Sequence, residues 1–308
     1  MSTLRSALCD YISMRRGLGY KFIQPEQRLG RFITFMERRG ASVVTRELAL
    51  EWAMQPTDRR ATWSLRLSDV RGFAHYLRNI DLRHQVPASG ILPFPARRKP
   101  YLYTDAEIAD LLTAAFALPP SKGLRRWTYH CLLGLLAVSG LRISEALDLQ
   151  RKDVDLENGV VTIRDTKFGK MRLVPVHHTT RSILRRYATQ RDTRLDPPKS
   201  PYFFVGARGG QLLLQNVYAV FWRLSRQTGL RAPSAHHGPR LHDFRHRFAV
   251  QTLLNGYRSG ERVELILPVL STYLGHGCVR DTYWYLSACP ELLGHAASRL
   301  EKRREHKP

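Results

Sequence analysis

The chain has 308 residues, of which 43% are hydrophobic, so its length favours two domains with ordinary cores. Its longest apolar run, residues 131–138, is too short to cross a membrane, and we expect no secretory signal at the N-terminus. No two cysteines form a C-x-x-C pair, which predicts a reduced chain in the cytoplasm. The cysteines are Cys9, Cys131, Cys278 and Cys289. These features argue against membrane-spanning and disulfide-stapled proteins.

The charge of the chain points to a polyanionic partner. The chain has 49 lysines and arginines and 26 acidic residues, which gives a formal net charge of +23. Residues 1–95 carry 15 basic and 8 acidic side chains and the remainder carries 34 and 18, so both parts are basic. Because neutralised phosphates release condensed counterions, this excess favours a polyanionic partner.

Four short amphipathic helices are predicted in the first 85 residues, over 4–14, 25–40, 46–54 and 63–77. Thr45 is a candidate N-cap for the third helix. The apolar stripe of the second helix is Leu29, Phe32, Ile33 and Met36, and that of the fourth is Trp63, Leu67, Val70, Ala74 and Leu77. Such helices predict a compact N-terminal bundle over residues 1–95, which by itself identifies no function.

A linker is predicted at residues 86–102. Prolines 87, 93, 95 and 100 exclude a regular helix there and favour a stiff, extended segment that includes the basic run 97–99. Thr104 and Glu107 then form the pattern of a capping box, which predicts a helix to about Ala117. A second domain is therefore expected over residues 103–308.

The second domain is predicted to be mostly helical with a small antiparallel sheet. Residues 127–138 are apolar on nearly all sides, as in a buried helix, and 141–149 predict another helix. Segments 159–164 and 172–176 read as two strands joined by a turn that contains Gly169. Helices resume from Thr180 and end with one over 291–304. The fold class expected for the whole chain is mainly α, or α+β.

Three short boxes in this half carry residues suited to phosphate chemistry. They are residues 139–147, residues 241–246, and residues 274–276 followed by Tyr285 nine residues after His276. Cutting a phosphodiester needs a nucleophile, positive charge on the phosphoryl oxygens and a proton for the leaving oxygen. Arg142 and Arg245 each offer a fork of donors, and His242 lies on the same helical face as Arg245.

The boxes, in this order and with a lysine-bearing hairpin between the first two, resemble the tyrosine recombinase (phage integrase) family over about residues 100–290. The resemblance implies that two arginines and two histidine-position residues hold the phosphate, a hairpin lysine protonates the leaving 5′ hydroxyl, and a tyrosine is the nucleophile. The corresponding residues are Arg142, Arg245, His242, His276, Lys167 and Tyr285, while Glu145 orients the site. Lys170 and Tyr283 remain the alternatives for the lysine and the tyrosine.

The resemblance also implies partners. The substrate would be double-stranded DNA held between the two domains, with the N-terminal bundle as the core-binding domain. The resemblance further implies a homo- or hetero-tetramer of recombinases on DNA, in which the last helix docks onto the adjacent protomer. It also implies a protein that associates with the nucleoid through DNA. No cofactor is implied. A zinc site is the rival interpretation of the histidine-rich positions, but they lack a zinc-finger spacing. They are His236, His237, His242, His246, His276 and Cys278.

One spacing departs from the family pattern. Arg245 and His276 are 31 residues apart, longer than is typical, and the extra length around residues 256–262 predicts a longer loop. Two other functions stay open at this point. One is a non-catalytic DNA-binding protein that keeps the boxes as relics, although every chemical position still holds a competent side chain. The other is an enzyme like a type IB topoisomerase, which cleaves DNA without exchanging partners.

Overall fold

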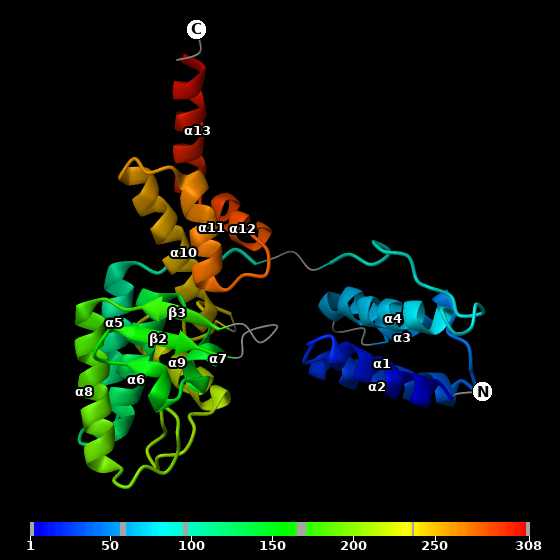
Figure 1. Ribbon diagram of the computed structural model, residues 1–308, viewed down its shortest axis with the longest axis horizontal. Helices are drawn as coiled ribbons and strands as arrows, with labels where there is room; N and C mark the ends of the chain where they lie inside the picture. The colour runs from blue at the N-terminus through cyan, green and yellow to red at the C-terminus, as the bar shows by residue number, and fades with distance from the viewer. Residues whose placement is uncertain (1–2, 56–59, 95–97, 165–170, 236, 306–308) are drawn as a thin grey trace. The chain divides into compact units, whose positions relative to one another are not determined.

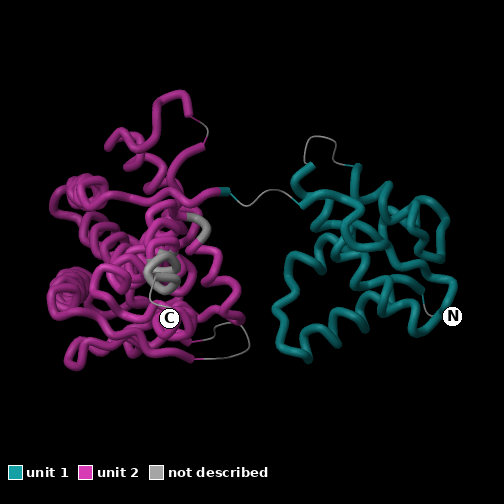
Figure 2. The backbone as a smooth tube through the Cα atoms, turned by 90° about the horizontal axis from the view of Figure 1, so that it is seen from above, with its two compact units in different colours: residues 1–98 teal, residues 99–308 magenta. Residues whose placement is uncertain are grey.

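The computed structural model describes residues 3–55, 60–94, 98–164, 171–235 and 237–305. The chain forms two compact units, residues 1–98 and 99–308, which are coloured separately in Figure 2. The boundary lies among the prolines between residues 86 and 102. Each unit has a hydrophobic core of its own.

Unit 1 is helical throughout its regular structure (Figure 1). Its described elements are α1 (Leu4–Gly17), α2 (Ile23–Arg38), α3 (Arg46–Met54), the 3₁₀ turn η1 (Arg60–Thr62) and α4 (Trp63–Arg78). The four predicted helices are confirmed, and the Thr45 hydroxyl accepts a hydrogen bond from the Leu48 amide as the expected N-cap. The apolar stripe of α2 is fully buried against Trp52 of α3 and the inner face of α4. Each of these helices has one apolar face, and the faces pack against one another because this removes them from water.

Unit 2 is a mainly helical domain with a small sheet, as predicted. Its first half contains α5 (Asp105–Phe116), α6 (Leu124–Ser139), α7 (Ile143–Asp148), η2 (Arg151–Asp153), β1 (Val154–Asp155), β2 (Val160–Ile163), β3 (Arg172–Pro175) and α8 (His178–Arg194). Its second half contains α9 (Leu214–Gln227), α10 (Leu241–Arg258), α11 (Val263–Leu274), α12 (Arg280–Ala288) and α13 (Pro290–Glu305). Thr104 and Glu107 form the predicted capping box of α5.

Helix α6 is the centre of unit 2. It packs against α5, α8 and α10, and nearly its whole length is buried (Figure 1). A helix that is apolar on all sides is stable only when other elements surround it, which explains this central place. A second hydrophobic cluster joins α10, α11, α12 and the start of α13, and α13 projects away from the sheet.

The sheet has the antiparallel order β1-β2-β3. In the β2–β3 ladder, Val160 pairs with Pro175 and Ile163 pairs with Arg172, so Ile163 and Arg172 form the last pair before the connection between the strands. Val161, Ile163 and Val174 point into the core. The sequence predicted β2 and β3 but not β1, whose two residues are too few to show an alternating pattern.

The longer loop expected around residues 256–262 is absent, and this prediction was wrong. Helix α10 continues to Arg258, and only residues 259–262 separate it from α11. Gly256 lies inside α10, and a Cβ there would meet Cδ1 of Ile266 in α11, so the Ile266 side chain would have to shift for any larger residue. Residues 256–258 therefore belong to a helix.

Candidate active site

The site forms where helices α6 and α11 end. Each is closed by a glycine with left-handed backbone, Gly140 (φ 61°) and Gly275 (φ 67°). Such a C-cap leaves carbonyl groups at the helix end available to donors from elsewhere. Gly140 also admits the ring of Phe248, whose Cδ1 lies 2.6 Å from the position of a Cβ. Two helix ends thus present carbonyl oxygens to the same place.

Arg245 of α10 fills this place. Its side chain is almost fully buried, with the residue 1% exposed, and its guanidinium donates from Nη1 to the Gly140 carbonyl (2.9 Å) and from Nη2 to the Leu274 carbonyl (2.6 Å). The negative ends of two helix dipoles therefore stabilise the buried cation. Burial lowers the pKa of Arg245 to about 10, and the charge of Arg142 acts in the same direction. The guanidinium is still protonated at neutral pH.

Arg142 lies beside Arg245 but remains half-buried. It occupies the N-cap position of α7, and its guanidinium reaches the carbonyls of Leu274 (3.5 Å) and Gly275 (3.3 Å). The Leu274 carbonyl thus accepts hydrogen bonds from both arginines. This contact brings the first and second boxes together at the first residue of the third box. The partly exposed face of Arg142 leaves donors for an anion from solution.

Glu145 balances part of this positive charge. Its carboxylate accepts from the Arg142 amide (2.9 Å) and from Arg142 Nη1 (2.7 Å), and it also forms a two-bonded pair with Arg172 of β3. Burial alone would raise the pKa of Glu145, but the hydrogen bonds and charges of Arg172 and Arg142 outweigh it and hold the pKa below its ordinary value. Glu145 is therefore an anion that organises two arginines.

His242 lies one turn before Arg245 on α10 and is exposed. Partial desolvation lowers the pKa of His242 below its ordinary value, and the charge of Arg245 adds to this shift. Its ring packs edge-to-face against that of His246, with centroids 4.6 Å apart. At neutral pH His242 is mostly the neutral imidazole, which donates one hydrogen bond and accepts another.

Tyr285 of α12 points inward. The residue is 1% exposed, and its ring lies 6.2 Å from that of His276 and 5.5 Å from that of His246. Its phenol is also close enough to Arg245 to affect the pKa of that guanidinium. Tyr283, the alternative, is 53% exposed. Two positions along a helix turn a side chain by about 200°, so the two tyrosines face opposite ways.

The structure brings together five residues singled out from the sequence, together with Glu145. They are Arg142, His242, Arg245, His276 and Tyr285. Lys167, its rival Lys170, and Gly169 lie outside the described residues. Among the residues described, no three His, Cys, Asp or Glu side chains are grouped to hold a metal ion.

Three residues at the site were not singled out from the sequence as parts of it. Arg172 pairs with Glu145, the Thr282 hydroxyl lies 2.7 Å from His276 Nδ1, and His246 packs between His242 and Tyr285. Two features of the sequence could have pointed to these residues, the R-x-V-P pattern that contains Arg172 and the position of His246 directly after Arg245. Neither feature indicates which side chain the residue contacts, because that depends on the fold.

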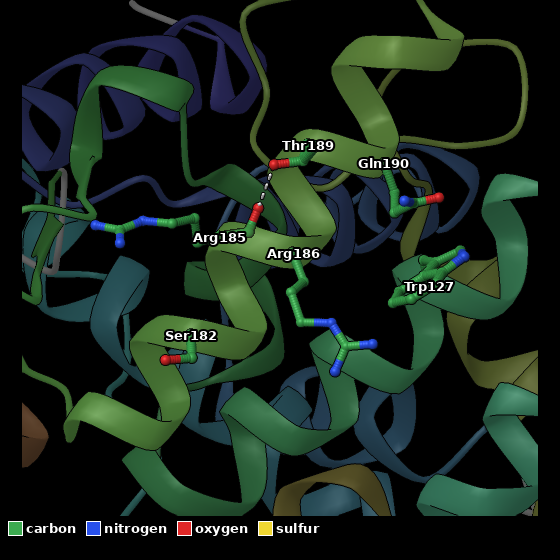
Figure 3. A pocket seen from close by; sticks show the side chains of 6 residues that line it. All are labelled: Trp127, Ser182, Arg185, Arg186, Thr189 and Gln190. Atoms are coloured by element: carbon green, nitrogen blue, oxygen red, sulfur yellow. Dashed lines mark hydrogen bonds between the residues drawn. The ribbon is translucent and has the colours of Figure 1, made fainter.

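A hollow of about 410 Å³ lies elsewhere in unit 2, open to solvent. Figure 3 shows its lining, in which Trp127 of α6 faces side chains of α8. The lining residues are Trp127, Ser182, Arg185, Arg186, Thr189 and Gln190, and none of them belongs to the arginine site.

No described helix is long and apolar enough to cross a membrane.

Comparison with known proteins identifies the family. The model of the phage integrase family matches residues 104–290, which contain every box described above. The chain belongs to the phage integrase family. The resemblance of these boxes to tyrosine recombinases is thereby confirmed at the level of the family.

Individual relatives agree with this assignment. A protein of Sinorhizobium fredii named as an integrase/recombinase, y4rB, is 48% identical over 99% of both chains. The integrase of transposon Tn1549, solved with transposon right-end DNA, is 17% identical, with a TM-score of 0.71 over 98% of this chain and 99% of that one. The lambda integrase tetramer on a Holliday junction gives a TM-score of 0.63 at 16% identity, over 92% of this chain and 77% of that one. These two structures show a shared fold.

Proposed function

We propose that this chain is a site-specific recombinase that cuts and rejoins double-stranded DNA through Tyr285. The phenol oxygen attacks a backbone phosphorus and forms a 3′-phosphotyrosine bond, and the phenolic proton passes to solvent. The bond from phosphorus to the 5′ oxygen breaks, and that oxygen leaves as a hydroxyl after taking a proton from Lys167. Another 5′ hydroxyl reverses the step. Because one phosphodiester replaces another, the exchange needs no ATP.

The observation that carries this proposal is the meeting of Arg142 and Arg245 at the Leu274 carbonyl, with Tyr285 close to Arg245. Negative charge grows on the phosphoryl oxygens in the transition state. Two guanidiniums held in place before the substrate arrives stabilise that charge without further reorganisation. Arg245 is fixed by burial, and Arg142 presents its exposed face to the phosphate.

The remaining residues have supporting roles in this scheme. His242 and His276 supply hydrogen bonds to the phosphate, and Glu145 orients Arg142. We infer that unit 1 is the core-binding domain and that the protein works as a tetramer on DNA, with α13 docked onto the adjacent protomer. The Tn1549 integrase bound to transposon-end DNA supports the DNA substrate, and the lambda integrase tetramer bound to a Holliday junction supports the tetramer.

The test is capture of the covalent intermediate. Because the DNA site is unknown, nicked duplexes that carry it are first selected from a random-sequence library through adducts that survive denaturation. The unaltered chain is expected to form such an adduct in EDTA, since arginines neutralise the phosphate. Tyr285→Phe is expected to abolish it, because the substitution removes only the attacking oxygen.

Tyr283→Phe is the matched control, because the Tyr283 ring is exposed, and it is expected to keep the adduct. An adduct that persists undiminished in Tyr285→Phe contradicts the assignment of the nucleophile. Incubation of the protein with two duplexes, each carrying one selected site, then distinguishes recombination from simple relaxation. A recombinase yields joined products of both duplexes, whereas an enzyme of the topoisomerase type reseals each duplex on itself.

A further inference from the structure

We propose that Thr282 is a positioning residue for His276, whose ring it holds at Nδ1 so that the other nitrogen, Nε2, carries the hydrogen offered to the phosphate. The inference rests on the proposed function, since the choice of ring nitrogen matters only if His276 binds a phosphate. It assigns a part in the reaction to a residue that lies between the histidine and the tyrosine of the third box.

The backbone of His276 is fixed by the end of helix α11. Beyond the left-handed Gly275, the His276 amide donates to the Ser271 carbonyl over 3.0 Å. The Gly275 amide donates to the Thr272 carbonyl over 2.9 Å. These two bonds form the Schellman type of helix C-cap. Helix α11 therefore sets the position of the His276 Cα, and the side-chain torsions decide where the ring lies.

The hydroxyl of Thr282 fixes the ring. Its Oγ1 lies 2.7 Å from His276 Nδ1, and Thr282 is 0% exposed, so this hydroxyl cannot turn to water instead. Thr282 belongs to α12, and its amide donates to the Val279 carbonyl over 2.8 Å. A buried polar group that loses its partner is not compensated by solvent. The ring of His276 is therefore held by a group that is itself part of a helix.

The same helix carries the proposed nucleophile. Thr282 and Tyr285 are three positions apart on α12, so their side chains lie on one face of the helix. Both residues are buried. The rings of His276 and Tyr285 are nearly parallel, with 20° between their planes and 6.2 Å between their centroids. One face of α12 therefore places the tyrosine and holds the histidine beside it.

The chemistry of the imidazole gives this hydrogen bond its consequence. A neutral imidazole carries its hydrogen on one ring nitrogen and accepts at the other. When the Thr282 hydroxyl donates to Nδ1 of His276, the hydrogen is on Nε2, which then donates to a phosphate oxygen. The opposite tautomer would present a lone pair to that oxygen and repel it. Thr282 thus selects the tautomer that binds an anion.

The first measurement is the cleavage rate of full-length variants on a suicide duplex selected through Tyr285-dependent adducts. It is made at about pH 8, where imidazoles are ordinarily neutral. Thr282→Val keeps the shape of the side chain without the hydroxyl. It is expected to cleave about 10- to 100-fold more slowly, as for a buried polar group that loses its partner. Thr282→Ser keeps the hydroxyl and is expected to cleave at nearly the unaltered rate.

A double mutant separates an effect through His276 from an effect on the placement of α12. In a chain that already carries His276→Ala, Thr282→Val is expected to change the rate by less than about twofold, because the ring that it positions is gone. If Thr282 acted by placing Tyr285, the loss of rate would be the same with and without His276.

The ring nitrogens of His276 give a readout that does not depend on activity. In isotope-labelled protein at about pH 8, the nitrogen NMR signals of this ring are expected to show a bare Nδ1 and a protonated Nε2. Their absence in His276→Ala assigns them. Thr282→Val is expected to move both signals toward those of mixed tautomers, and Thr282→Ser is expected to keep them in place.

Thr128→Val is the matched structural control. Thr128 is 1% exposed in α6, and its hydroxyl donates to the carbonyls of Leu124 and Val205, which are not part of the arginine site. This variant is expected to lose stability in a thermal melt, as Thr282→Val does, but to cleave like the unaltered chain. If Thr282→Val does not fold, Thr282→Ala replaces it, with the same rates and NMR signals expected.

Any of four results would overturn the proposal. They are a Thr282→Val variant that cleaves at the unaltered rate, a loss of rate that is equal with and without His276, His276 signals that do not respond to the Thr282 hydroxyl, and a Thr128→Val variant that is slowed as much as Thr282→Val. Failure of the proposed function gives a different result. The unaltered chain would then form no Tyr285-dependent adduct, while the ring signals would still report the hydrogen bond to Thr282.

Discussion

At the scale of single residues, the two phosphate-binding arginines differ in what holds them. Arg245 is buried and bonds the carbonyls of Gly140 and Leu274, so it belongs to the packing of unit 2. Arg142 is half-buried and shares its contacts with Glu145. Both arginines are proposed to bind the same phosphate, but they contribute differently to the stability of the fold.

Replacing each arginine by glutamine makes this difference measurable. Arg245→Gln is expected to lower the free energy of unfolding by about 2 kcal/mol, because buried carbonyls lose their donors. Arg142→Gln is expected to lower it by less than about 1 kcal/mol, since its site is open to water. Urea denaturation gives both values. Equal losses of stability would contradict the assignment of Arg245 to the core.

At the scale of elements, the site depends on where helices stop. Helices α6 and α11 end at glycines with positive φ, and the carbonyls exposed there receive the arginines. A helix that ran one turn further would bond those carbonyls internally. The C-caps therefore create the acceptor sites, and the first and third boxes each contain one of them, Gly140 and Gly275.

Two glycines test this idea, Gly140 at the C-cap of α6 and Gly134 inside that helix. Gly140→Ala is expected to destabilise the protein by about 1–2 kcal/mol or more, from the left-handed backbone and from the clash with Phe248. Gly134→Ala, in the same helix, meets only Leu112 at 3.8 Å and is expected to stabilise it by about 0.5–1 kcal/mol. Thermal and urea unfolding measure both changes. A Gly140→Ala variant as stable as Gly134→Ala would show that the C-cap is dispensable.

At the scale of the whole molecule, positive charge is shared by both units. Unit 1 carries 17 basic and 8 acidic residues, and unit 2 carries 32 and 18. A double helix is a dense line of negative charge, and each neutralised phosphate releases counterions to solution. Both units are therefore expected to contribute to affinity for DNA.

The salt dependence of binding measures this contribution. Affinity for a random-sequence duplex, followed by fluorescence anisotropy, is expected to fall by about 10³-fold between about 50 and 200 mM salt. A fall of this size corresponds to roughly six or more phosphates neutralised together. An affinity that changes by less than about tenfold over this range would contradict a broad electrostatic interface.

The sequence by itself determined the features that depend on neighbours along the chain. The stripe of α2, the N-cap at Thr45 and the capping box at Thr104 follow from local periodicity and hydrogen bonding, and they were predicted correctly. The spacing of the boxes also identified the family. Local rules failed at β1, which is too short to show a pattern, and at residues 256–258, where α10 continues although the spacing suggested a loop.

Only the tertiary structure decided which groups meet. Arg172 and Glu145 are 27 residues apart, and Arg245 reaches a carbonyl 105 residues away in the chain. It also turned Tyr285 inward toward His276 and Tyr283 outward, although the two share one short helix. These outcomes depend on how helices pack and where they end, because a side chain's partners come from the core around it.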